Sequence, residues 1–134
     1  MKVFCSYAFT GEDEAVVADR MEKIVEVLRG NGHEVYCNLF DKHTVPLLDK
    51  NDVKAILLDA FTHLADCDVV VAIVTSPRRS IGQSMELGVA LNDSKPIHLF
   101  EHESARHSTY LENISDTHAV WVTEEDLITQ LREI

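Results

Sequence analysis

The segment DVVVAIVTSPRRSIGQSMELGVA, residues 68–90, predicts a buried strand that leads into a helix, and this unit decides the fold. Residues 68–74 form a near-continuous apolar run, which is typical of a strand covered on both faces of a parallel sheet. Ser80 can cap the helix that follows, because a serine hydroxyl accepts from the free N–H groups of a first turn. The segment therefore predicts the strand–helix unit of an α/β protein.

The start of this helix contains the first candidate site. Gln83 can reach back as the capping-box partner of Ser80, and Gly82 lets another group approach the backbone closely. Ligands of open α/β sheets bind beyond the carboxyl ends of the strands, so Glu86 lies where chemistry usually occurs in such a fold. We expect the helix macrodipole to keep this carboxylate ionised, as a nucleophile requires.

Strand-like and helix-like patterns alternate along the rest of the chain. Strands are expected at residues 2–7, 34–37, 96–100 and 119–122, and helices at 15–29, 52–65, 108–113 and from a cap at Thr123 to Arg132. Residues 38–50 are polar and contain Pro46, so we expect a mobile loop over the site. This alternation predicts one three-layer α/β domain over residues 1–134, with a flavodoxin-like (Rossmann-like), five-stranded parallel sheet of order 2-1-3-4-5.

Composition excludes several classes of partner. The chain has 134 residues and a net charge of −11, which repels polyanions, so we expect no binding to nucleic acid. No apolar run approaches the ~20 residues that span a membrane. Its three cysteines have no metal-binding spacing and indicate buried free thiols in a reducing compartment. Since no signal peptide precedes the first strand, we expect a cytoplasmic protein without a membrane partner.

The same segment resembles a known family. The run Ser-Met-Glu-Leu-Gly-Val-Ala-Leu, followed by Lys95-Pro96-Ile97, is similar to the signature of the nucleoside 2-deoxyribosyltransferases, whose relatives include the deoxynucleoside 5'-monophosphate N-hydrolases. The strand at 68–72 and the Thr-x-Pro at 75–77 resemble the hydrolase branch in particular. The resemblance implies transfer or hydrolysis at the N-glycosidic bond of a nucleoside or its 5'-monophosphate, without a cofactor. Such displacements pass through an oxocarbenium-like state that a carboxylate can trap.

The resemblance also implies roles for individual residues. Glu86 is the nucleophile that attacks C1' of the sugar. Ser80 and the backbone N–H of Gly82 hold the substrate phosphate, although helix capping alone also explains Ser80. Ser6 and Tyr7 line the crevice, where Tyr7 contacts the Glu86 carboxylate or the sugar, or simply packs.

Other positions depart from the family pattern or extend the site. The first loop, Ala8-Phe9-Thr10, lacks the arginine of the hydrolases and resembles the apolar loop of the transferases, with Phe9 as a substrate contact. Ala60 occupies the place of a family aspartate, so neighbouring Asp59 is the candidate for acting on the leaving base or the sugar. Ser108 and Thr109 either cap a short helix or reach a neighbouring subunit's site in a homodimer or dimer-based oligomer.

Two further arginines and the histidines have simpler explanations. Arg78-Arg79 lengthens the loop before the helix, either to contact phosphate or to face solvent. His98, His102 and His107 lack metal-ligand spacing, so we expect surface or packing histidines and no metal.

Another function of the same fold stays open. A catalytically inactive nucleotide-binding module, or a signalling module similar to Toll/interleukin-1 receptor domains, is the alternative, since residues 4–13 faintly resemble the opening of those domains. A phosphorelay receiver is excluded because no aspartate ends the strand at 68–74, and the glycine motifs of dinucleotide and P-loop sites are missing.

Overall fold

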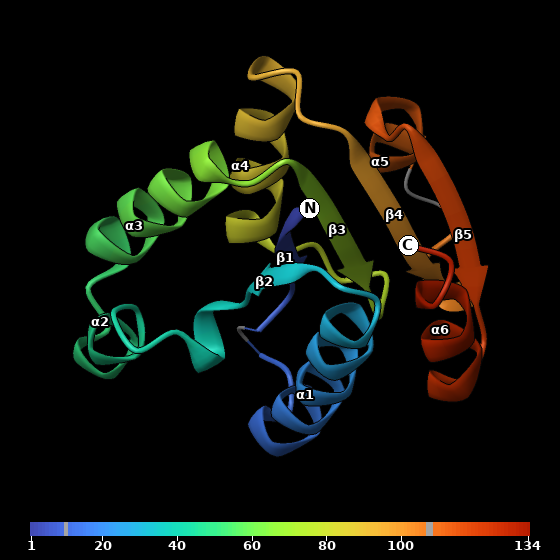
Figure 1. Ribbon diagram of the computed structural model, residues 1–134, viewed down its shortest axis with the longest axis horizontal. Coiled ribbons are helices and arrows are strands. Elements are labelled where there is room, and N and C mark those ends of the chain that lie inside the picture. Colours follow the sequence, from blue (N-terminus) through green and yellow to red (C-terminus); the bar gives the residue numbers. More distant parts are fainter. Residues whose placement is uncertain (10, 107–108) are drawn as a thin grey trace.

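The computed structural model describes residues 1–9, 11–106 and 109–134. Five parallel strands form one sheet in the order β2-β1-β3-β4-β5, which confirms the predicted fold class and strand order (Figure 1). The strands are β1 (Lys2–Tyr7), β2 (Glu34–Tyr36), β3 (Val69–Val74), β4 (Ile97–His102) and β5 (Thr117–Trp121). The helices are α1 (Glu14–Gly30), α2 (Val45–Lys50), α3 (Val53–Asp66), α4 (Ile81–Asn92), α5 (Thr109–Ile114) and α6 (Glu124–Leu131), with 3-10 turns η1 (Asn38–Phe40) and η2 (Glu103–Ala105).

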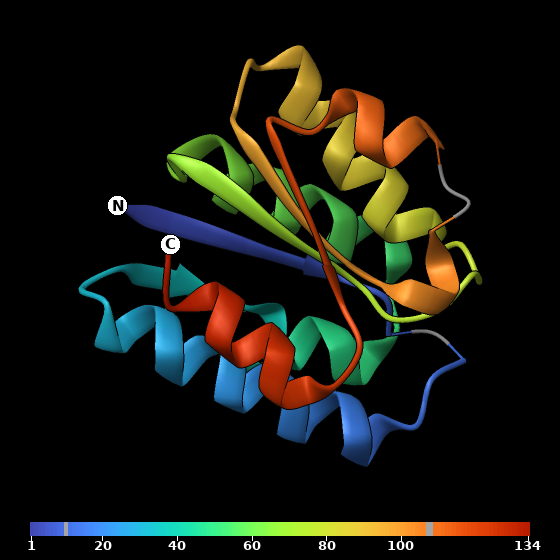
Figure 2. The ribbon, with the colours of Figure 1, turned by 90° about the vertical axis from the view of Figure 1, so that its right-hand side faces the viewer.

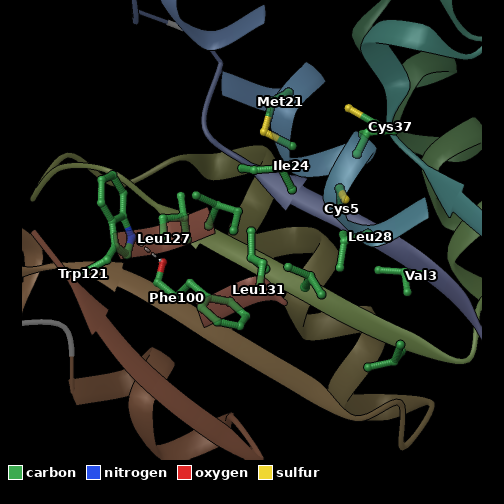
Figure 3. Close-up of a cluster of buried hydrophobic side chains, with 14 of the residues drawn as sticks. Val3, Cys5, Met21, Ile24, Leu28, Cys37, Phe100, Trp121, Leu127 and Leu131 are labelled. Carbon is green, nitrogen blue, oxygen red and sulfur yellow. Dashed lines mark hydrogen bonds between the residues drawn. The ribbon is translucent and has the colours of Figure 1, made fainter. Parts of the chain in front are cut away.

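The helices cover both faces of the sheet. Helices α1 and α6 pack on one face, and α4 and α5 lie on the opposite face (Figure 2). On the first face the apolar stripe of α1 and two leucines of α6 meet alternate residues of the strands; the labelled members include Val3, Cys5, Met21, Ile24, Leu28, Phe100, Leu127 and Leu131 (Figure 3). Trp121 closes this layer, where its indole N–H donates to the Phe100 carbonyl at 3.2 Å. Each helix therefore forms because burial of its apolar side stabilises it.

Strand β3 is the centre of the sheet. All six of its residues are buried, because β1 and β4 flank it and helices cover both of its faces. This confirms the predicted strand without a solvent face for residues 69–74, whereas Asp68 precedes the strand and is exposed. The register places Tyr7 beside Ile73, so the carboxyl ends of β1 and β3 lie side by side.

The expectation of an irregular loop over residues 38–50 is wrong. This segment forms η1 and α2, and Pro46 lies in the first turn of α2, where a missing N–H costs nothing. The Asp41 carboxylate accepts from the backbone N–H groups of His43 and Thr44 and turns the chain into that helix. The buried Thr44 hydroxyl then donates to Asp59 at 2.7 Å, so the segment is tied to α3.

Two further expectations concern the described residues. Cys5, Cys37 and Cys67 are free and buried, as the sequence predicted, and burial raises the pKa of the Cys37 and Cys67 thiols to about 11. Among the helices of residues 1–9, 11–106 and 109–134, none combines the length and the apolar character that a bilayer crossing requires.

Candidate active site

One amide side chain joins the two strand ends that form the crevice. The buried Gln83 amide donates to the carbonyl oxygens of Ser6 at 3.1 Å and Ile73 at 3.0 Å. Ser80 caps α4 as predicted, accepting from the Gln83 backbone N–H at 3.2 Å. The prediction that the Gln83 side chain completes a capping box is wrong. Its amide N–H groups donate to two buried carbonyls at the strand ends, so the side chain is held there and does not accept from the Ser80 backbone N–H.

Glu86 is half-buried on α4 and points to the end of β1. The Ser6 hydroxyl, which is fully buried, donates to the Glu86 carboxylate at 2.8 Å. Burial raises the pKa of Glu86 to about 7, and the Ser6 hydrogen bond offsets part of this rise. The carboxylate is therefore poised between its two protonation states near neutral pH.

The expectation that the macrodipole keeps Glu86 ionised is thus corrected. Glu86 lies beyond the first turn of α4, whose N-cap is Ser80. The dipole's effect falls off within that turn, so loss of hydration determines the pKa.

Tyr7 does not contact Glu86 through its hydroxyl. The Tyr7 hydroxyl donates to the side-chain oxygen of Asn38, a residue that follows β2 in the chain. Burial, followed by the neighbouring Cys37, raises the pKa of Tyr7, and the Glu86 charge raises it further, so the two side chains lie within electrostatic range. Tyr7 therefore borders the site as a neutral phenol. Phe9 packs half-buried against the α1 core, and a role for it in binding substrate stays a prediction.

Asp59 and Ala60 face different surroundings. Ala60 is buried in the core between α3 and the sheet. The Asp59 carboxylate accepts from Thr44 and lies 3.1 Å from His43 Nδ1 and 3.7 Å from His63 Nε2. Its charge and that of Glu86 both raise the pKa of Tyr36, after the larger effect of burial. Tyr36 thus lies within electrostatic range of both carboxylates, and the catalytic role of Asp59 stays a prediction.

A hollow of ≈ 100 Å³ lies at the N-terminus of α4. Its lining includes Ser80, Ser84, Arg78 and Arg79, and Leu111 and Ala105 form its apolar wall. The Arg78 guanidinium lies directly against Gly11, whose φ is +81°, and any side chain at position 11 would collide with it. Arg78 therefore spans from the loop after β3 to the loop after β1, rather than facing solvent alone.

The remaining predicted residues have the following places. Gly82 lies in the first turn of α4, and no described protein atom lies within 4 Å of where its Cβ would be, so this side of the backbone is open. Thr109 begins α5, whereas Ser108 and His107 lie outside the described residues. His98 bonds the Thr117 hydroxyl and His102 the Ser104 hydroxyl.

Sequence reasoning missed two groups of side chains. Gln83 was assigned to a cap, although a glutamine three residues after a capping serine at a strand–helix junction also has strand-end carbonyls within reach. Two clusters with metal-binding donor atoms, Asp41–His43–His63 and Glu101–Glu112–His118, each join residues from separate elements or loops, so no single local spacing indicated them.

Comparison with known proteins identifies the family and supports the fold. The sequence model of the family described as nucleoside 2-deoxyribosyltransferase matches residues 4–128. Among solved structures, the chain is similar to the CMP N-glycosidase BcmB of Clostridium botulinum, with a TM-score of 0.68, 19% identity, and 98% of this chain and 97% of that one covered. It is also similar to a 2-deoxyribosyltransferase of Bacillus psychrosaccharolyticus, with a TM-score of 0.58, 21% identity, and 98% and 96% covered. No curated protein sequence matches it.

Glu86→Gln should make the protein more stable at pH 8. The folded-state pKa of Glu86, about 7, lies above its ordinary value of 4.5, so the folded protein loses stability as pH rises between these values. An uncharged glutamine avoids this loss, and we expect a gain of up to about 3 kcal/mol at pH 8 that shrinks to below about 1 kcal/mol at pH 5.

Urea unfolding at both pH values measures the difference, with Glu26→Gln on the exposed side of α1 as the matched control. The control should change stability by less than about 0.5 kcal/mol. Equal stability of Glu86→Gln and the parent at pH 8 would show that Glu86 is an ordinary solvated glutamate.

Proposed function

This chain belongs to the nucleoside 2-deoxyribosyltransferase family, and on that premise we propose that it cleaves or transfers the N-glycosidic bond of a nucleoside or nucleoside 5'-monophosphate. The observation that supports this best is the contact between Ser6 and Glu86, which holds a half-buried carboxylate with a pKa of about 7 at the carboxyl ends of the strands. A group that titrates near neutral pH in a crevice is typical of catalysis.

We propose that ionised Glu86 attacks C1' of the sugar. The C1'–N bond breaks, its electron pair passes to the base, and the base takes up a proton as it leaves. Water or a second base then attacks C1' of the glycosyl-Glu86 ester, and the carboxylate is released. The Ser6 hydroxyl orients the attacking oxygen and stabilises the ionised form, because it donates to the carboxylate.

Two neighbouring side chains are proposed to assist. Tyr7, held by Asn38, forms part of the wall against which the sugar packs. In the structure, Asp59 contacts Thr44, His43 and His63. It can therefore act on the leaving base only if the substrate extends toward Tyr36. Asp59→Asn tests this role separately from that of Glu86.

The buried position of Ala60 favours a second candidate, a nucleotide-binding protein without activity. An alanine within the core cannot donate a proton to a leaving base. In that case the chain would bind nucleotides but release no base from any nucleoside or nucleoside monophosphate. Substituting Glu86 would then not change the result.

Glu86→Ala should abolish base release. The nucleophile contributes most of the rate in a covalent mechanism, so we expect kcat/KM to fall by at least about a thousandfold. Chromatography of free base, after incubation with a panel of nucleosides and their monophosphates with and without an acceptor base, measures it. Glu26→Ala is the control, and unchanged turnover by Glu86→Ala would exclude the mechanism.

Ser6→Ala should move the acidic limb of the pH–rate profile to higher pH. The Ser6 hydroxyl lowers the pKa of Glu86, so its removal raises that pKa and reduces the ionised fraction at a given pH below it. We expect kcat/KM to fall more at pH 6 than at pH 8.5. A uniform fall across this range would assign Ser6 to packing alone.

We further propose that the hollow at the N-terminus of α4 holds the 5'-phosphate. Arg78, Ser80 and the Gly82 backbone N–H offer charge-assisted and neutral donors there, and a helix N-terminus favours an anion. The first loop lacks an arginine, but Arg78 reaches that loop from the opposite side of the crevice. The similar fold of a CMP N-glycosidase makes CMP and dCMP the first monophosphates to test.

Arg78→Gln should remove a preference for monophosphates over nucleosides. A hydrogen bond to a charged group contributes ~1.5–3 kcal/mol, so kcat/KM for the monophosphate should fall by about ten- to a hundredfold while that for the nucleoside changes little. Arg132→Gln, after the end of α6, makes the same change of charge away from the hollow. Equal losses for both substrates would exclude a phosphate contact.

We propose a homodimer or dimer-based oligomer formed through α4 and α5. Ile81 and Met85 on α4 and Tyr110 on α5 are large apolar side chains that are exposed by 80%, 47% and 73%. Tyr110→Glu should therefore yield a monomer in sedimentation velocity. A parent protein that is monomeric and fully active at micromolar concentration would contradict this arrangement.

A further inference from the structure

Three elements bring two carboxylates and an imidazole together beneath α5. Glu101 lies near the end of β4, Glu112 lies on α5 and His118 lies on β5. His118 Nε2 is 3.1 Å from Glu101 Oε1 and 3.7 Å from Glu112 Oε1. One donor atom from each of the three residues lies within 4.8 Å of the other two.

Glu101 is the unusual member of this cluster. Its side chain is 0% exposed, and among the described residues its Oε2 atom has no hydrogen-bond partner. A buried carboxylate is costly unless its charge is compensated and its oxygens are bonded. His118 can balance one charge when it is protonated, but Glu112 adds a second negative charge at the same place.

A divalent cation would satisfy all three groups at once. A tetrahedral ion with bonds of about 2.1 Å separates its ligand atoms by about 3.4 Å, and the two N–O distances in this cluster lie on either side of that value. One imidazole and two carboxylates form a donor set that suits Zn²⁺ and, with more water ligands, Mn²⁺. We propose that Glu101, Glu112 and His118 bind one divalent cation of the Zn²⁺ class, with water completing its coordination.

The position of this site indicates a structural role. Its ligands would tie α5 to β4 and β5, and Leu111, which precedes Glu112, forms part of the apolar wall of the hollow beside α4. The ion would therefore fix that wall and take no part in bond cleavage. This proposal revises our expectation of no metal and does not depend on the proposed function.

The other donor cluster, Asp41–His43–His63, is satisfied without a metal. Asp41 Oδ1 already accepts from His43 and Thr44, and His43 Nδ1 lies 3.1 Å from Asp59. The His43 side chain is 79% exposed, so no unpartnered buried charge requires an ion there. This cluster provides a matched control.

Calorimetric titration of chelator-treated full-length protein with ZnCl₂, and separately with MnCl₂, tests the site. We expect one Zn²⁺ per chain and a rise in thermal midpoint with Zn²⁺. Glu101→Gln and His118→Gln should each weaken Zn²⁺ binding by at least about tenfold, because even the loss of a residue that only supports a metal ligand has an effect of this size. His43→Gln should leave the Zn²⁺ affinity unchanged. Circular dichroism in chelator checks that each variant is folded.

Glu112→Gln replaces the buried variants in this test if they do not fold, because Glu112 is partly exposed. The absorption of bound Co²⁺ reports whether a histidine and carboxylates form a tetrahedral site, and it should disappear in His118→Gln. Absence of Zn²⁺ binding by the parent overturns the proposal. Binding that survives Glu101→Gln and Glu112→Gln, or that is lost in His43→Gln, also overturns it.

Discussion

The Gln83 amide, hydrogen-bonded to the carbonyl oxygens of Ser6 and Ile73, is the interaction on which the candidate site depends. Parallel strands end with unpaired carbonyls, and a buried carbonyl without a donor is costly. By satisfying one carbonyl from each strand, Gln83 fixes the N-terminal half of α4 against β1 and β3. The Ser6 side chain is then free to donate to Glu86, three residues further along the same helix. The position of Glu86 beside Ser6 thus depends on one buried amide, whereas burial sets its acidity.

The partly buried Glu86 carboxylate costs the folded protein stability. A carboxylate with a pKa of about 7 is one that the folded protein ionises reluctantly, because burial removes water that no cationic partner replaces. The large cores on the two faces of the sheet offset this cost. The nucleophile role that we propose for Glu86 would use such a carboxylate, whose pKa no neighbouring arginine or lysine lowers.

The sequence predicted the fold because its signals are local. The near-continuous apolar run at 68–74, the stripe of α1 and the Thr123–Asp126 capping box are each readable within one element. Contacts that cross the sheet were not predictable in this way. Gln83 and Ser6 are 77 residues apart, and their meeting depends on strand register and helix rotation together. The helix α2 was missed because a proline was read as a loop signal, although it lies in a first turn. The role of Asp59 in acting on the leaving base or the sugar stays a prediction, and its contacts with Thr44 and His43 could not be read from its spacing.

The packing of Arg78 against Gly11 links two loops that are distant in sequence. Position 11 combines a left-handed backbone with no room for a Cβ, so only glycine meets both requirements while the guanidinium is in place. A bulkier residue at position 11 would displace the guanidinium of a long side chain at position 78, so we expect relatives with such a residue to carry a shorter or redirected side chain there. The two positions should covary across the family, and a matched pair would mark members that carry a guanidinium across the mouth of the crevice. A search for this pair of residues would identify such members, whereas the sequence of either loop alone would not.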